Sequence, residues 1–179
     1  MDYLNKMRGN GSSSPPRTTP CDILWSWLGS FLGIALVAIL NYHLLAESDA
    51  VLLIGSFGAS AVLIFGAVSA PLAQPRNLIG GHFVSAIVGV TMFQMFGNTL
   101  WLAAALAVSL AIALMHITRT LHPPGGATAL IAVIGSGKIH ALGYTYAIIP
   151  VTTGALLMLL VALIVNNIPN KRQYPKYWW

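Results

Sequence analysis

The feature that most constrains this chain is a series of long apolar runs. Five such stretches lie at residues 23–45, 51–70, 78–96, 99–118 and 144–168. Because a helix needs roughly 20 apolar residues to cross the hydrocarbon core of a bilayer, each stretch can form a transmembrane helix. The composition agrees, since only 7% of the residues are charged, against about 25% in soluble domains. We therefore predict an all-α, polytopic membrane protein.

A shorter apolar piece at residues 125–136 decides the number of membrane segments. Lys and Arg accumulate on the cytoplasmic side of membrane proteins. With six segments and an inner amino terminus, eight of the nine Lys and Arg residues fall on that side and Lys138 alone falls outside. With five segments, the three basic residues of the carboxyl-terminal tail would face outward. The charges therefore favour about six hydrophobic segments.

This count divides the chain into three parts. We expect a disordered cytoplasmic tail at residues 1–20, a transmembrane domain at 21–170 and a second cytoplasmic tail at 171–179. The first part is rich in Gly, Ser and Pro and has little to bury. It lacks a long transit segment rich in Ser and Arg, so the sequence favours a prokaryotic inner membrane over an organelle.

The two halves of the transmembrane domain resemble each other weakly. A shift of 68 residues places Gly58–Ile64 over Gly126–Ala132, in the second and fifth hydrophobic segments. Two triplets of spans would form a 3+3 inverted repeat, as in many transporters. The abundance of Gly and Ala offers chance as the alternative explanation.

The repeat suggests where an anion could bind. If the second segment breaks at Gly55–Gly58 and the fifth at Pro123–Gly126, helices restart at Ala59 and Ala127. Free amides at a helix start attract an anion, and the hydroxyls of Ser60 and Thr128 would add donors. The alternative is that these small residues only let helices pack closely, as we expect for Gly29 and Gly33.

Several function classes find little support in the sequence. No acidic residue lies inside a confident span, which disfavours carboxylate proton relays and catalysis by paired carboxylates. The histidines lack the spacing of metal ligands, Cys21 is the single cysteine, and the basic residues form no nucleic-acid-binding stripe. We therefore predict no enzyme activity, no cofactor and no nucleic acid partner.

The segment His122–Leu130, which reads HPPGGATAL, resembles the HPP family of integral membrane proteins. Phe57–Ala61, Pro71–His82, Thr118–Leu121 and the tail from Asn166 to Trp178 are similar to the family as well. Plant plastid and cyanobacterial relatives are linked to nitrite transport. The resemblance therefore implies transport of a small monovalent anion, with nitrite the first expectation.

The same motifs give the expected substrate-binding residues. Arg76 and Arg119 lie on the predicted inner side, where a guanidinium could attract an anion and grip two of its oxygens, although both also fit ordinary positive-inside residues. His82 and His122 could donate to an anion or could be structural. The full set is Gly58, Ala59, Ser60, Arg76, Asn77, His82, Arg119, His122, Gly125, Gly126, Ala127 and Thr128.

The sequence is compatible with two interpretations of the function. The first is an anion pathway lined by helix amino termini in a lipid bilayer, and the second is a membrane scaffold or sensor subunit that transports nothing. An inside-negative potential opposes anion uptake by about 2.3 kcal/mol per 100 mV, so uptake needs a driving gradient. Small residues such as Gly29 and Gly33 would also allow a homo-oligomer.

Overall fold

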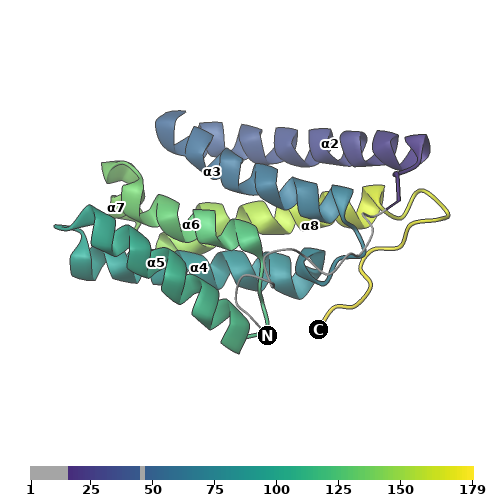
Figure 1. The fold of residues 1–179 in the computed structure, drawn as a ribbon. Helices are drawn as coiled ribbons and strands as arrows, with labels where there is room; N and C mark the ends of the chain where they lie inside the picture. The colour runs from purple at the N-terminus through teal and green to yellow at the C-terminus, as the bar shows by residue number, and fades with distance from the viewer. Residues whose placement is uncertain (1–15, 45–46) are drawn as a thin grey trace, which may run out of the picture.

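A computed structural model describes residues 16–44 and 47–179 of the chain (Figure 1). Every regular element in these ranges is a helix, so the predicted helical membrane bundle is confirmed. Most of the tail expected at residues 1–20 lies outside the described residues, and the first described helix begins at Pro20.

The helices fall on all six expected segments. The first three segments are α2 (Pro20–Leu44), α3 (Glu47–Ala61) continued by the π-helix η1 (Val62–Gly66), and α4 (Pro75–Phe96), which follows the short 3₁₀ helix η2 (Pro71–Ala73). The last three are α5 (Leu100–Ile117), α6 (Pro123–Ile134), and η3 (Ala147–Thr152) continued by α8 (Thr153–Val165). A short helix α7 (Gly137–Leu142) follows α6.

Four of these segments are long and apolar enough to cross a membrane. They are residues 20–43, 75–96, 100–117 and 147–165, whereas the apolar parts of the second and fifth segments are shorter. Half of the α4 and η3–α8 spans is buried inside the bundle, against 17% of α2 and 22% of α5. The central helices are therefore α4 and α8, while α2 and α5 turn most of their surface outward to lipid.

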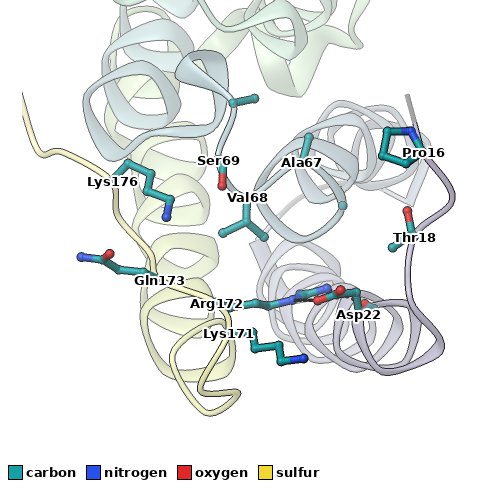
Figure 2. A pocket seen from close by; sticks show the side chains of 12 residues that line it. Pro16, Thr18, Asp22, Ala67, Val68, Ser69, Lys171, Arg172, Gln173 and Lys176 are labelled. Atoms are coloured by element: carbon teal, nitrogen blue, oxygen red, sulfur yellow. Dashed lines mark hydrogen bonds and ion pairs between the residues drawn. The ribbon is translucent and has the colours of Figure 1, made fainter. Parts of the chain in front are cut away.

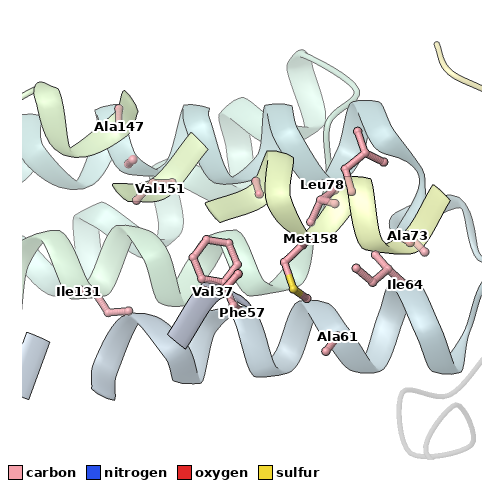
Figure 3. Packing of buried hydrophobic residues seen from close by; sticks show 14 of the residues in the cluster. Val37, Phe57, Ala61, Ile64, Ala73, Leu78, Ile131, Ala147, Val151 and Met158 are labelled. Carbon is pink, nitrogen blue, oxygen red and sulfur yellow. The ribbon is translucent and has the colours of Figure 1, made fainter. Parts of the chain in front are cut away.

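The apolar core lies between α2, α3, α4 and α8 (Figure 3). Phe57, Met158 and Leu78 fill its middle, and each is fully buried. The glycines of α2 complete the packing, because a Cβ atom at Gly29 would lie 2.4 Å from Phe65 and one at Gly33 would lie 3.0 Å from Met158. Close packing is therefore the role of both glycines, and it is used within the chain.

The structure corrects the expected breaks in the second and fifth segments. The prediction of a break at Gly55–Gly58 is wrong, since α3 runs through these residues without interruption. The expected helix start at Ala127 is also wrong, because α6 begins four residues earlier, at Pro123. In lipid, an unpaired backbone group has no water to bond, so a helix that can stay continuous does so.

The break occurs instead in the last segment, which the sequence predicts as one span from 144 to 168. Ile149 has φ −124° and ψ 119°, outside the helical region, and Pro150 has no amide hydrogen to donate. The hydroxyls of Thr152 and Thr153 donate to the carbonyls of Ala147 and Ile148 at 2.6 and 3.0 Å. The backbone amide of Thr153 also bonds to the carbonyl of Ile148, so the hydroxyls add to the backbone hydrogen bonds around the kink.

Candidate functional site

Two histidines meet at one serine in the interior of the bundle. The Oγ atom of Ser60 lies 2.8 Å from Nε2 of His82 and 2.9 Å from Nε2 of His122. All three side chains have no exposed surface. The imidazole rings of the two histidines lie 5.0 Å apart, centroid to centroid. A buried, ionisable group at membrane depth is a functional-site candidate by default, because burying it is costly.

Further hydroxyl groups extend this cluster on the far side of His82. Its Nδ1 atom lies 2.7 Å from Oγ1 of Thr128, and that oxygen lies 2.9 Å from Oγ of Ser56. Ser56 also donates to the carbonyl of Pro124 at 3.0 Å. We call the five side chains Ser56, Ser60, His82, His122 and Thr128 the central network. Each of them is at least 98% buried.

Three helices and one loop supply the central network. Ser56 and Ser60 are four residues apart, so they share one face of α3. His82 projects from α4 and Thr128 from α6. His122 precedes a proline, which favours an extended backbone, and it has φ −140° and ψ 104°. Its Nδ1 atom then donates to the carbonyl of Leu72 in η2, at 2.9 Å.

Glycines let these elements approach closely. A Cβ atom at Gly81 would lie 2.5 Å from Cβ of His122, and one at Gly125 would lie 2.7 Å from Oγ of Ser85. Added side chains at these positions would push α4 away from the 120–125 segment. The close approach of α4 and α6 thus holds His82 against Thr128.

The start of α6 does not offer free amides to an anion. Its first two residues, Pro123 and Pro124, have no amide hydrogen, and the amide of Gly125 bonds to the carbonyl of His122 at 2.8 Å. Ala59 and Ser60 lie within the continuous helix α3, where amides bond the preceding turn. The two helices therefore do not present opposed amino-terminal ends whose backbone amides could bind an anion.

Four expected site residues lie away from the central network. Ala59 and Ala127 are exposed, and Gly58 has open space where its side chain would be. Gly126 and Ala127 line an apolar groove between α5 and α6. A role for these four residues in substrate binding stays a prediction.

A second polar region lies at one end of the bundle, which we call the basic end and define by Arg76, Arg119 and Arg172. Asn77 of α4 ties this end together by donating to the carbonyl of Leu121 at 2.8 Å. The buried Nε of Arg76 and Oδ1 of Asn77 have no hydrogen-bond partner among the described residues. Beside them is a cavity of about 210 Å³, lined by Pro75, Arg76, Ile79, Gly80, Thr120, Trp178 and Trp179.

Arg119 has a different place at the basic end. Its side chain is exposed, and its φ of 57° lies in the left-handed region that favours glycine. The amide of Thr120 bonds the carbonyl of Met115 at 2.8 Å, and the amide of Arg119 bonds that of His116 at 3.2 Å. This pattern is a Schellman motif, which ends α5 and turns the chain toward His122.

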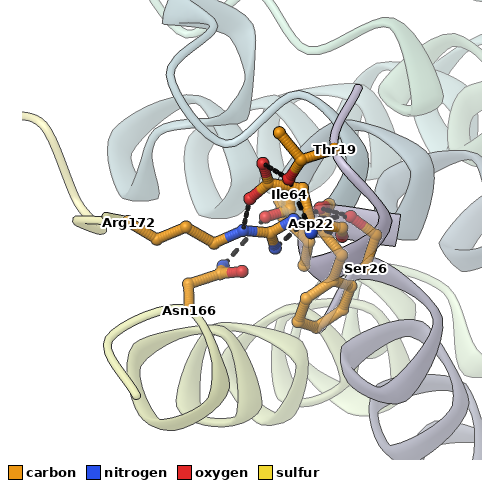
Figure 4. A network of polar contacts seen from close by, with 7 residues as sticks. Thr19, Asp22, Ser26, Ile64, Asn166 and Arg172 are labelled. Carbon is orange, nitrogen blue, oxygen red and sulfur yellow. Dashed lines mark hydrogen bonds and ion pairs between the residues drawn. The ribbon is translucent and has the colours of Figure 1, made fainter. Parts of the chain in front are cut away.

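The segment after α8 packs across the basic end (Figure 4). Arg172 forms an ion pair with Asp22 at 2.9 Å, and it also donates to Oγ of Ser26 at 2.9 Å. Thr19 also donates to Asp22 at 2.6 Å. We call these four side chains, Thr19, Asp22, Ser26 and Arg172, the terminal network. Asn166 donates to the carbonyl of Ile64 at 2.9 Å and fixes the end of α8 to η1.

The same segment borders a larger cavity at the basic end (Figure 2). This cavity has a volume of about 610 Å³, and Ser69, Lys171 and Lys176 are among its lining residues. Tyr174 anchors the segment, because its hydroxyl donates to the carbonyl of Ala73 at 2.8 Å. Burial raises the pKa of the Tyr174 phenol, so the group keeps the hydrogen that it donates.

The structure unites some of the predicted residues and adds one that sequence reasoning missed. Ser60, His82, His122 and Thr128 meet in one network, although the sequence analysis treated the histidines separately from the hydroxyls. Ser56 was missed as a site residue. Its position four residues before Ser60, on the same face of an apolar helix, was the available signal.

Comparison with known proteins identifies the family. The profile described as "HPP, transmembrane region" matches residues 15–175, nearly the whole chain. The chain belongs to the HPP family. Its resemblance at the HPPGGATAL segment is thereby confirmed, and the segment supplies His122 and Thr128 to the central network.

Two relatives of this HPP protein come from Dictyostelium discoideum. Transmembrane protein DDB_G0273707/DDB_G0273361 is 52% identical over 182 residues, which cover 100% of this chain and 58% of the relative. Transmembrane protein DDB_G0269096 is 49% identical over 183 residues, which cover 100% of this chain and 64% of the relative. The chain thus spans about three fifths of the length of these relatives. No solved structure matches it.

Proposed function

We propose that this HPP protein transports a small monovalent anion, nitrite first of all, across a membrane. The observation that carries the proposal is the central network, in which Ser60 bridges two fully buried histidines inside a membrane bundle. Hydroxyl and imidazole groups can both donate to an anion, and neither holds it with a permanent full charge. Such a site can release the ion as well as bind it.

The basic end supplies an approach for the anion. The buried Nε of Arg76 lacks a partner among the described residues, and Arg76 lines a cavity of about 210 Å³. A guanidinium presents two parallel N–H groups, which suit the two oxygens of nitrite. The unpaired donor and the cavity beside it together support Arg76 as the group that receives the ion.

In this proposal the anion moves between Arg76 and the central network. Arg76 and His82 are six residues apart on α4, or about 9 Å along the helix. Between them, Gly80 contacts Thr120 and Gly81 contacts His122. The absence of side chains at these two glycines keeps the loop 120–122 close to α4. An anion that moves between His82 and Arg76 would pass between this loop and α4.

The remaining predicted residues take supporting roles in this proposal. Asn77 positions the loop through the carbonyl of Leu121, and Gly125 allows α6 to pack on α4. Arg119 is exposed and attracts anions from solvent. Gly58, Ala59, Gly126 and Ala127 would contact substrate only in another conformation of the bundle.

The next question is how the protein is placed in its membrane. Four helices long enough to span and the family assignment make this a multi-pass membrane protein. We propose that the basic end is cytoplasmic, since Arg76, Arg119 and Arg172 gather there. The relatives named above are eukaryotic, so the prokaryotic inner membrane stays a prediction.

Nitrite uptake into vesicles tests the proposal. The purified full chain is reconstituted, and flux is compared for wild type, Arg76→Gln and Lys138→Gln, a control at the opposite end of the bundle. We expect flux above that of empty vesicles, a loss of about tenfold for Arg76→Gln, and little change for Lys138→Gln. Flux of folded wild-type protein equal to empty vesicles would favour the scaffold or sensor function instead.

A further inference from the structure

The hydrogen positions of the central network can be assigned from one end. The carbonyl of Leu72 can only accept, so Nδ1 of His122 carries a hydrogen. In the neutral imidazole, Nε2 of His122 is then an acceptor, and Ser60 must donate to it. The oxygen of Ser60 in turn accepts from Nε2 of His82. We assign these tautomers from the partners of each ring.

The assignment continues on the other side of His82. Because Nε2 of His82 donates, its Nδ1 accepts from the hydroxyl of Thr128 at 2.7 Å. The single hydroxyl hydrogen of Ser56 has two acceptors within reach, Oγ1 of Thr128 at 2.9 Å and the carbonyl of Pro124 at 3.0 Å. When it turns to Thr128, the five side chains form one chain of hydrogen bonds that all point in the same direction, from Ser56 to the carbonyl of Leu72.

This hydrogen-bonded chain reaches from the basic end into the middle of the membrane. Ser56 lies ten residues before the end of η1 at Gly66, which is about 15 Å along the helix. The hydrocarbon core of a bilayer is about 30 Å thick. Ser56, at one end of the chain of hydrogen bonds, therefore lies about half of that thickness from the end of η1.

The central network can also accept one additional proton without losing a hydrogen bond. If the proton binds Nδ1 of His82, the Thr128 hydroxyl can turn to the carbonyl of Pro124, 3.4 Å away. If the charge is on His122 instead, the Ser60 hydroxyl can turn to the carbonyl of Ser56, also 3.4 Å away. Both hydroxyls have a second acceptor within their own helix, so neither protonated state leaves a donor unpaired.

We propose that the central network is a proton relay that carries one proton with each anion. The proposal rests on the transport function proposed above and names its second substrate. A proton binds Nδ1 of His82, the Nε2 hydrogen of His82 passes to the Ser60 oxygen, and the Ser60 hydrogen passes to Nε2 of His122. The positive charge moves from His82 to His122, while Ser60 ends with one hydrogen as before. When the bundle opens at the basic end, His122 releases its Nδ1 hydrogen to water there and becomes neutral again.

The surroundings explain why proton and anion would move together. In the described residues, no carboxylate, Lys or Arg bonds to the central network. Tyr146, the residue before η3, donates from its phenol to the carbonyl of Thr128 at 3.1 Å. It is the titratable group that faces the central network from this part of the chain. Phe57 of α3 and Met115 of α5 are uncharged neighbours. Asp49 bonds to Ser136 instead.

A charged imidazolium in this setting therefore needs a counter-ion from outside the protein. A monovalent anion supplies it, and the pair crosses with no net charge. The membrane potential then does no work on the transported pair. A proton gradient can then drive anion uptake, although the inside-negative membrane potential opposes the entry of an anion alone.

Paired flux measurements in vesicles test the relay. The full chain is reconstituted in vesicles that contain the pH dye pyranine, valinomycin and potassium clamp the potential, and an inward nitrite gradient is applied. Protein-free vesicles correct for permeation of nitrous acid. We expect the wild type to move one proton inward with each nitrite, at a rate that does not depend on the clamped potential.

Matched serine variants separate the relay from general packing. Ser60→Ala removes the bridge between the histidines, whereas Ser85→Ala removes a fully buried hydroxyl that bonds to the sulfur of Met115 instead. We expect Ser60→Ala to lose at least tenfold of the proton-coupled flux and Ser85→Ala to stay within twofold of wild type. Helical content and elution volume confirm that both variants fold.

The outcomes distinguish the two proposals. Nitrite flux that carries no protons and follows the potential would overturn the relay and leave anion transport intact. Equal proton coupling in Ser60→Ala and wild type would also overturn the relay. No nitrite flux in the folded wild type would overturn the transport function itself, and the relay with it.

Discussion

The central network and the terminal network solve the problem of polar side chains in a membrane protein differently. The central network is built from neutral hydroxyl and imidazole groups, each at least 98% buried. The terminal network contains the ion pair of Arg172 with Asp22, whose side chain is 36% exposed. Charge is placed where water can reach it, and uncharged hydrogen bonds are used at depth.

The two networks are expected to contribute differently to stability and to function. Hydrogen bonds between transmembrane helices contribute about 0.6 kcal/mol on average and up to about 1.7 kcal/mol. In the pair of Arg172 with Asp22 the arginine is buried and the carboxylate is open to water, so water and salt screen the pair only in part. We therefore expect changes in the central network to affect both folding and flux, and changes in the terminal network to affect folding alone.

The largest effect is expected from Thr128→Val. Valine keeps the shape of threonine but cannot donate to His82 or accept from Ser56. We expect the free energy of unfolding in detergent to fall by about 1–3 kcal/mol, and nitrite flux to fall at least tenfold. The control is Thr91→Val, whose hydroxyl bonds to the carbonyl of Ile87 in its own helix and to the exposed hydroxyl of Tyr144. Equal losses in the two variants would contradict the special role of the central network.

The next effect concerns the contact between α4 and α6 that supports the central network. At Gly125 an added Cβ would lie 2.7 Å from Oγ of Ser85 and 2.9 Å from the carbonyl of Gly81. We expect Gly125→Ala to lower the unfolding free energy by about 1–2 kcal/mol. At Gly126 the nearest atom is 3.8 Å away, so Gly126→Ala should be neutral or stabilising. Chemical denaturation of both variants measures the contrast, and a neutral Gly125→Ala would show that the helices can separate freely.

A smaller effect is expected in the terminal network. Arg172→Ala removes the bonds to Asp22 and Ser26, and we expect Tm in detergent to fall by about 2–4 °C. The loss should shrink at high salt, because part of it is a screened ion pair. Flux should stay within twofold of wild type, as should that of Lys171→Ala, the matched cation beside it. A flux loss confined to Arg172→Ala would place this arginine in the anion route.

The smallest effect is expected at Arg119, and it has the opposite sign. Its φ of 57° suits glycine better than arginine, so Arg119→Gly should stabilise the protein by about 0.5–1 kcal/mol. Arg119→Ala loses the same charge without this gain. If Arg119 only attracts anions from solvent, both variants should lower flux about twofold at low salt and not at high salt. A tenfold loss at all salt concentrations would instead make Arg119 a binding residue.

Much of the fold was predictable because each membrane-spanning helix can be recognised from its own run of apolar residues. The six hydrophobic segments follow from the length of their apolar runs, and helices occupy all six. The helix bounds at α5, Leu100–Ile117, differ by one residue at each end from the expected 99–118. The break at Ile149 was not predicted, although Pro150 marked the region.

The candidate site was predictable in its members and not in its arrangement. His82, His122, Ser60 and Thr128 were singled out by their polarity within apolar segments and by the family resemblance. The sequence analysis nevertheless placed the anion at two helix starts. It could not show that Pro123 and Pro124 remove the amides that such a site needs, since that depends on where α6 begins.

The amino-acid sequence alone was enough to predict a helical membrane protein and to predict that most of its Lys and Arg residues lie on one side of the membrane. Apolar length and the positions of Lys and Arg suffice for that, because transfer into lipid depends on each segment separately. The hydrogen bonds between side chains 22 to 72 residues apart in the central network depend on the three-dimensional packing of the helices. The rotation of each helix about its axis sets which polar atoms meet, and that rotation is the joint result of packing along every helix contact.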